Sequence, residues 1–141
     1  MNTAKTKISF LVNQGEYNGL QCTEWFVDEV LVFSTGTDQR ITELLEFDVT
    51  LPCCLTIKIA GKNINQDTEV IDGKITQDKF IEIKKLCLAR VPVKVNTLIK
   101  ICEYTDDTGQ LHNSAYWHRN GEVQIKFSES DPISWLLTNN H

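Results

Sequence analysis

The chain has 141 residues, of which 41% are hydrophobic and 23% are charged, and its formal net charge at pH 7 is -5. This length matches one domain over residues 1-141, and the apolar runs are too short for a membrane-spanning helix. The acidic balance argues against a nucleic-acid surface, because phosphate binding needs a positively charged face. We therefore predict one domain with no nucleic-acid partner and no membrane partner.

The first residues, MNTAKTKISFLV, combine two lysines with a short apolar run, as signal peptides do. Ser9 interrupts that run, however, and no small-residue cleavage site follows it. We interpret the stretch as a first β-strand, and we expect that the protein is not secreted by a signal peptide.

Short alternating runs rich in Val, Ile, Phe and Thr recur along the chain with turn signals between them, whereas helix-length periodicity is almost absent. This pattern is typical of two packed sheets. We predict an all-β fold, a single-domain antiparallel β-sandwich of the jelly-roll type, with strands at residues 5–12, 22–27, 30–34, 44–50, 54–60, 79–89, 97–104, 111–117 and 122–127.

Turn residues punctuate these strands. The pair Asp28-Glu29 predicts a tight hairpin between two strands, and Asn120-Gly121 is a second hairpin signal. Near the C-terminus, Asp131 is a suitable N-cap and Pro132 a suitable first helical residue. A short C-terminal helix or turn is therefore predicted.

The five cysteines are an odd number, and the chain contains no C-x-x-C pair. They fall within predicted strands, where cysteine behaves as a small buried hydrophobe. We favour buried thiols in a reducing compartment over a zinc site for this set: Cys22, Cys53, Cys54, Cys87 and Cys102.

A long polar segment, residues 61–79, connects two strongly β-like runs. Calcium takes six to eight oxygen ligands from flexible loops, and this segment offers suitable carboxylate and amide oxygens. The spacing is not that of an EF-hand. Calcium is thus the candidate cofactor, with the predicted metal ligands Asn63, Asp67, Glu69, Asp72 and Asp78. The alternative is a solvated strand connection with Asp72-Gly73 as the turn of a small hairpin.

Three aromatic residues are candidates for ligand binding, because flat rings pack on sugar faces while nearby polar groups fix the hydroxyls. They are Trp25, Tyr116 and Trp117. Neighbours on a strand point to opposite faces, so Tyr116 and Trp117 cannot both lie in the core. Core or subunit contact is the alternative role for each ring.

Catalysis has little support in the sequence. His112, His118 and His141 lack any nucleophile or zinc-binding motif around them. The spacing of His112 and His118 places them on one face of an extended strand, where Cys102 or Cys87 of a neighbouring strand could complete a Cys-His pair. We predict that the protein is not an enzyme and keep this thiol site as the alternative.

Residues 24–88 contain, in order, WFVD at 25–28, FDVTLP at 47–52, LTIKI at 55–59 and the polar segment. This layout resembles that of the calcium-dependent carbohydrate-binding modules with a β-sandwich fold that are attached to xylan-degrading enzymes. The characteristic Asn-Asp and Arg-Asn-Leu runs of those modules are missing here. The resemblance implies glycan as a partner and calcium as a cofactor.

The small acidic sandwich with odd reduced cysteines, closed by WHRNG at 117–121 and SDP at 130–132, is also similar to small proteins of tailed bacteriophages. That likeness implies protein partners in a larger assembly, with homo-oligomerisation possible, and location in the virion after assembly in the host cytoplasm. Our leading hypothesis is a non-catalytic structural or adhesive virion protein, as a capsid decoration, neck, tail or fibre component. The alternative is a calcium-dependent carbohydrate-binding module.

Overall fold

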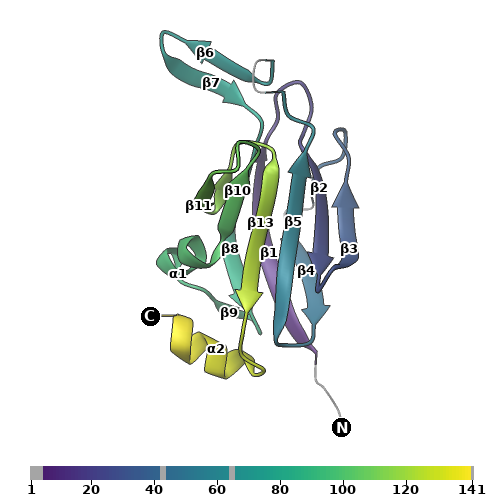
Figure 1. The fold of residues 1–141 in the computed structure, drawn as a ribbon, viewed down its shortest axis with the longest axis vertical. Helices are drawn as coiled ribbons and strands as arrows, with labels where there is room; N and C mark the ends of the chain where they lie inside the picture. The colour runs from purple at the N-terminus through teal and green to yellow at the C-terminus, as the bar shows by residue number, and fades with distance from the viewer. Residues whose placement is uncertain (1–4, 42–43, 64–65, 141) are drawn as a thin grey trace.

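A computed structural model of the chain describes residues 5–41, 44–63 and 66–140. Two antiparallel β-sheets pack face to face, and a separate two-stranded hairpin projects beyond one end of them (Figure 1). The apolar side chains of both sheets meet in one buried cluster. The predicted all-β sandwich is confirmed.

The first sheet is built around β1 (Thr6–Gly15), which pairs with β4 (Leu44–Val49) on one side and β8 (Phe80–Leu88) on the other. Two short strands, β12 (Tyr116–Trp117) and β9 (Val91–Pro92), pair with β8. Strand β8 therefore has three neighbours in this sheet, whereas β4 forms its other edge beside β1.

The second sheet has six strands. In spatial order they are β11 (Leu111–Asn113), β10 (Glu103–Asp106), β13 (Gly121–Phe127), β5 (Cys53–Ala60), β2 (Cys22–Val27) and β3 (Val30–Thr35). Strand β5 alternates buried and outward-facing residues along its whole length, so that Cys53, Leu55, Ile57 and Ile59 face the core. This is the pattern from which the sequence predicted the strand.

A β-bulge in β8 keeps both halves of that strand facing the core. Lys84 is an extra residue between the pairs Leu11–Lys85 and Val12–Ile83. One extra residue shifts the alternation by one position, so apolar residues before and after the bulge point the same way. The buried set from β8 is Ile81, Ile83, Leu86 and Leu88.

Two predicted hairpin turns are confirmed. Asp28 and Glu29 join β2 to β3 with positive φ angles of 47° and 70°. Asp72 and Gly73 join β6 (Thr68–Ile71) to β7 (Lys74–Asp78), the hairpin that projects in Figure 1. The Asn120-Gly121 signal does not form a hairpin, because β12 before it and β13 after it lie in different sheets.

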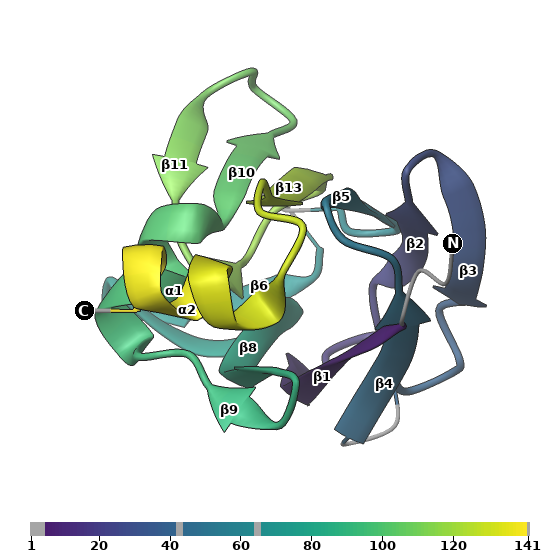
Figure 2. The ribbon, with the colours of Figure 1, turned by 90° about the horizontal axis from the view of Figure 1, so that it is seen from below.

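The predicted strand at residues 97–104 is wrong in its first part. Residues there form helix α1 (Val95–Ile101), and β10 begins only at Glu103. Hydrogen bonds to residues near the C-terminus stabilise the start of this helix. The Lys94 N–H donates to Asn140 Oδ1 at 2.6 Å, and the Thr97 hydroxyl donates to the Asn139 carbonyl at 3.0 Å. Figure 2 shows the two helices side by side.

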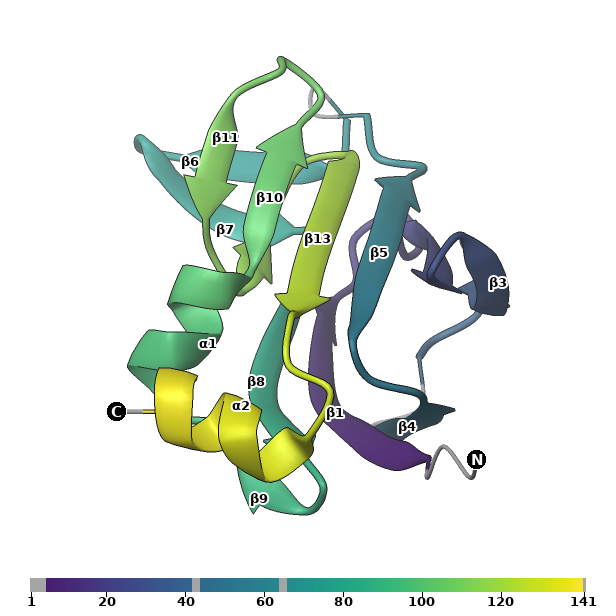
Figure 3. The same cartoon turned by 60° about the horizontal axis from the view of Figure 1, so that its bottom comes forward.

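The predicted C-terminal helix is confirmed as α2 (Pro132–Asn139). The Asp131 side chain caps it by accepting from the Ser134 N–H at 3.3 Å. Trp135 is buried, with its ring 5.1 Å from that of Phe127. The helix lies across the end of the sandwich next to β13 (Figure 3).

The predicted strand at residues 111–117 is also divided. Its first half is β11 in one sheet and its second half is β12 in the other. The chain passes from one sheet to the other at Ser114. The Ser114 N–H donates to the Cys102 carbonyl at 3.1 Å, and its hydroxyl forms hydrogen bonds with the backbone of Tyr116. Within the described residues, no helix has the length and apolar character needed to cross a membrane.

The cap of α2 gives a first prediction. Replacing Asp131 by Ala removes the side-chain acceptor for the Ser134 N–H, and we expect a loss of about 1 kcal/mol in unfolding free energy. Asp131→Asn keeps an acceptor oxygen and serves as the matched control. Urea unfolding of both variants measures the difference, and equal stability of Asp131→Ala and wild type would contradict the capping role.

Candidate binding site

The two buried tryptophans offer no surface to a ligand. Trp25 and Trp117 are both 0% exposed. The Trp25 ring packs 5.4 Å from Phe10 and its N–H donates to Thr23, whereas the Trp117 N–H donates to the Ser114 carbonyl. The predicted ligand-binding role of these two residues is therefore corrected to a core role, and Tyr116 is the member of the predicted set that reaches the surface.

Tyr116 is the centre of what we call the aromatic row, defined as Phe80, Tyr116 and His118. The Tyr116 ring lies 4.9 Å from that of Phe80 at an interplanar angle of 28°, and 6.0 Å from that of His118 at 25°. Tyr116 is 40% exposed, and His118 is exposed as well. The row is therefore a stack of three near-parallel rings at the edge of the first sheet.

The backbone of β1 leaves room for this row. A β-carbon placed on Gly15 would lie 2.2 Å from the ring of Phe80, so a residue with a side chain would displace that ring. Gly15 pairs with Phe80 in the sheet. The glycine thus allows the Phe80 ring to lie against the strand and support Tyr116.

The neighbours of the row keep its two titratable rings uncharged near neutral pH. Partial burial, together with the charge of Lys62, lowers the pKa of His118 below its usual 6.5. Burial, with smaller contributions from Asp78 and Glu82, raises the pKa of Tyr116 above 10.0. The row therefore presents a neutral, weakly polar surface over the physiological range.

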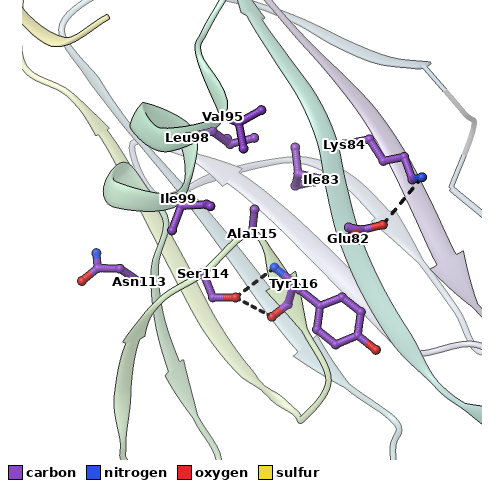
Figure 4. A pocket seen from close by; sticks show the side chains of 10 residues that line it. All are labelled: Glu82, Ile83, Lys84, Val95, Leu98, Ile99, Asn113, Ser114, Ala115 and Tyr116. Carbon is purple, nitrogen blue, oxygen red and sulfur yellow. Dashed lines mark hydrogen bonds and ion pairs between the residues drawn. The ribbon is translucent and has the colours of Figure 1, made fainter. Parts of the chain in front are cut away.

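A groove of about 390 Å³ adjoins Tyr116. Its lining comes from β8, from α1 and from residues 113–116, as Figure 4 shows. Ile83, Leu98 and Ala115 are apolar, whereas Glu82, Lys84 and Asn113 bring a carboxylate, an ammonium and an amide. This combination of apolar surface with a few polar groups is typical of small-ligand sites.

Local contacts hold the groove in shape. The Ser114 hydroxyl accepts from the Tyr116 N–H at 3.0 Å and donates to the Tyr116 carbonyl at 2.8 Å (Figure 4). Glu82 and Lys84 form an exposed ion pair at 4.0 Å, and the Asn113 amide donates to the Lys100 carbonyl at 2.8 Å. Each of these polar groups therefore has a partner within the protein.

The polar segment gives its carboxylates partners other than a metal. Asp67 accepts from Lys79 Nζ at 3.1 Å and from the Asn63 N–H at 2.7 Å. Asp78 accepts from Lys62 Nζ at 2.5 Å and from the Thr68 hydroxyl at 2.6 Å. Two of the five predicted calcium ligands are thus neutralised by lysines.

Glu69 and Asp72, two of the remaining predicted ligands, do not join them in one cluster. Glu69 accepts from Tyr17 and from Gln77, each at 3.3 Å, and Asp72 lies at the exposed turn of the β6–β7 hairpin. Among the residues that the structure describes, no group of three or more His, Cys, Asp or Glu side chains could hold a metal ion. The structure does not assemble the predicted set, so calcium binding by this segment stays a prediction from the sequence.

The lysines also affect the titration of the segment. Burial raises the pKa of Asp67, but hydrogen bonds from Asn63 and Lys79 outweigh it, and the net pKa is below 3.8. Because the folded-state pKa is lowered, the Asp67 carboxylate stabilises the fold above its unfolded pKa. That contribution is lost as the pH falls through the lowered value.

Sequence reasoning missed the part that four residues take in this region: Lys62, Lys79 and Phe80 were not candidates for any site, and His118 was considered only for the thiol site. A signal for the lysines was present, since they stand at the two ends of the polar segment and its carboxylates lie between them. Phe80 and His118 carry no comparable signal, because their contact with Tyr116 depends on which strands pair.

The alternative thiol site is not assembled. Burial raises the pKa of the Cys102 thiol to about 12, which leaves very little thiolate at neutral pH. His112 bonds Asp106 at 2.9 Å on one sheet, whereas His118 follows β12 of the other. The predicted placement of the two histidines on one strand face is therefore wrong.

Comparison with known proteins identifies the fold. No protein-family model matches the chain, and no curated protein matches it either. Two solved structures of vCBM60 are similar at 10% identity. One, in complex with galactobiose, has a TM-score of 0.56 and covers 85% of this chain and 97% of its own. The other has a TM-score of 0.55 and covers 86% and 90%.

The second match is described as part of an evolutionary link, through circular permutation, between two families of calcium-dependent carbohydrate-binding modules. At 10% identity these matches show a shared β-sandwich fold. The likeness to carbohydrate-binding modules noted in the sequence is thus supported at the level of the fold. The matches lend no support to the virion role, and the predicted location and assembly partners stay predictions.

The five predicted buried thiols differ in burial: Cys53 and Cys102 are buried, whereas Cys22, Cys54 and Cys87 are partly exposed. This difference gives a second prediction. Cys53 and Cys54 are neighbours, but Cys53 is buried and burial raises its pKa to about 11, whereas Cys54 is partly exposed. At pH 8 we expect iodoacetamide to modify Cys54 well before Cys53 or Cys102, as followed by peptide mass spectrometry. Unfolding in urea should make the rates similar, and early labelling of Cys102 in the native protein would contradict its burial.

Proposed function

We propose that the protein is a non-catalytic carbohydrate-binding module that holds a short glycan against the aromatic row and in the groove beside it. The observation that carries this proposal is the position of Tyr116. Its ring stacks with those of Phe80 and His118, and the same residue lines a groove that also contains a carboxylate, an ammonium and an amide. The shared fold with vCBM60 supports it.

The aromatic row suits the apolar side of a sugar. Pyranose rings carry C–H groups on their faces, and these groups pack against aromatic rings. The neighbouring rings hold Tyr116 in place, so little side-chain freedom is lost when a ligand binds. The Tyr116 hydroxyl adds a hydrogen-bond donor and acceptor to the same ring.

The groove suits the hydroxyl groups of the same ligand. Glu82 supplies acceptors, Lys84 supplies donors, and Asn113 supplies an amide group within one lining. Because these side chains are partly exposed and already paired, exchanging their partners for sugar hydroxyls carries a small desolvation cost. Such an arrangement favours moderate affinity for a neutral glycan.

Catalysis is not part of the proposal. Burial raises the pKa of the Cys102 thiol to about 12, and His112 lies on β11 of one sheet whereas His118 follows β12 of the other. The polar groups of the groove have partners among neighbouring residues, and Glu82 is paired with the Lys84 ammonium group. These features suit recognition of a ligand and supply no activated nucleophile.

The third prediction tests the row directly. We expect Tyr116→Ala to weaken binding of galactobiose, used as the first probe, by about tenfold, which corresponds to about 1.4 kcal/mol. Isothermal titration calorimetry measures the affinity, and a glycan array extends the test to other sugars. Phe26→Ala is the matched control, because Phe26 is a partly exposed ring on the second sheet, under Lys58.

Two results would count against the proposal. Equal loss of affinity in Tyr116→Ala and Phe26→Ala would show that the row has no special role. Absence of binding to galactobiose and to every sugar on the array, by a folded wild-type protein, would remove the carbohydrate-binding function altogether.

A further inference from the structure

The polar segment is closed at its base by what we call the lysine clamp, defined as Lys62, Lys79, Asp67 and Asp78. Lys62 follows β5 and Lys79 precedes β8, so the two lysines stand at the two ends of the segment. Each reaches across to the other end: Lys62 donates to the Lys79 carbonyl at 2.8 Å, and Lys79 donates to the Gly61 carbonyl at 3.3 Å.

Both ammonium groups of the clamp are withdrawn from water. The side chains of Lys62 and Lys79 are 1% and 4% exposed, and those of their partners Asp78 and Asp67 are 8% and 9% exposed. A buried charge is tolerated only when it is paired and its hydrogen-bonding capacity is used. Each lysine of the clamp is therefore a buried cation whose charge is balanced by an aspartate of the protein.

The site around Lys62 is the more complete of the two. Its ammonium group donates to one Asp78 carboxylate oxygen, to the Lys79 carbonyl and to the carbonyl of His118. Three acceptors match the three N–H donors of an ammonium group. A carboxylate and two carbonyls, drawn from separate parts of the chain, are also the kind of oxygen donors that a hard metal ion takes.

The backbone at Lys62 is fixed as firmly as its side chain. Its N–H donates to the Asn120 side-chain oxygen at 3.0 Å, and its carbonyl accepts from the Asn120 amide at 2.8 Å. The ammonium group therefore has little freedom to leave its acceptors. Through the His118 carbonyl it also holds the backbone of one member of the aromatic row.

The calcium-dependent character of the fold relatives does not fit this arrangement. Asp67 and Asp78, the two best-placed carboxylates of the segment, already neutralise Lys79 and Lys62. A divalent ion at the same place would have to displace a buried ammonium group or approach it closely, which Coulomb repulsion opposes.

We propose that the Lys62 ammonium group is the permanent internal cation of the polar segment, so that this chain keeps the base of its projecting hairpin in place without calcium. The cation is covalently tethered and its three acceptors are always present. The proposal concerns the scaffold and does not depend on which ligand the aromatic row binds.

The test begins with the wild-type protein. Its thermal unfolding midpoint is measured with excess calcium chloride and with a chelator, at equal ionic strength. We expect the same midpoint in both solutions. A clear rise with calcium would overturn the proposal, because a bound ion stabilises the folded state. This comparison needs no variant and decides the question even if a variant fails to fold.

Variants then test the ammonium group itself. Lys62→Met leaves Asp78 buried without its cation, and we expect its midpoint to fall by about 10 °C. The double variant Lys62→Met, Asp78→Asn removes both charges and should recover part of that loss. Lys126→Met is the matched control, since Lys126 pairs with Glu103 at 3.8 Å on the exposed surface. Equal midpoints for Lys62→Met and Lys126→Met would overturn the proposal.

A final variant separates an internal cation from an ordinary ion pair. Lys62→Ala removes the ammonium group and opens space beside one carboxylate and two carbonyls. We expect calcium, with water completing its coordination, to raise the midpoint of this variant while leaving that of wild type unchanged, whereas no response would overturn the assignment of a cation site. Failure of galactobiose to bind wild type would affect the proposed function alone and leave these midpoints unaltered.

Discussion

Desolvation of charge is the constraint on which the architecture of this protein depends. An ammonium group inside a protein must have close anionic or carbonyl partners, because an isolated buried charge costs several kcal/mol. Lys62 and Lys79 meet this requirement only when the two ends of the polar segment lie together. That closure links the end of β5 in one sheet to the start of β8 in the other.

The aromatic row begins at the same point, since Phe80 follows Lys79 directly and His118 supplies a carbonyl to Lys62. The buried ion pairs that hold the segment closed therefore also position the backbone of the candidate site.

Much of the fold follows from local pattern. Strand β5 could be predicted because its alternation holds without interruption, and α2 because Asp131 and Pro132 are strong start signals. Helix α1 could not, because its start depends on residues more than forty positions away in the chain: the Lys94 N–H donates to the Asn140 side chain, and the Thr97 hydroxyl donates to the Asn139 carbonyl. The candidate site shows the same division. Tyr116 was found as one of two adjacent rings on opposite faces, whereas its neighbours and the groove result from β12 crossing to the first sheet.

The polar segment shows why counting one type of residue misleads. Carboxylates alone suggest a metal site, but an ammonium group and a metal ion compete for the same oxygen atoms. They differ in what they need: an ammonium group uses three directed acceptors, whereas calcium takes six to eight oxygens. A segment that encloses its own lysines satisfies the smaller requirement, and it does so whatever the concentration of free metal ions. Which cation a loop uses therefore depends on pairing across the fold, and a list of acidic residues does not contain that information.

The β6–β7 hairpin beyond the clamp has a further consequence. Its tip at Asp72 and Gly73 extends past the sandwich, and a side chain added at Gly73 would meet nothing within 4 Å (Figure 1). Each strand is tied at its base: Thr68 of β6 and Lys62 both bond the Asp78 carboxylate. Exposed loop tips of this kind tolerate cleavage and insertion. The tip is thus a natural place to graft a foreign peptide, because both arms of the hairpin would stay anchored even with the chain cut or lengthened between them.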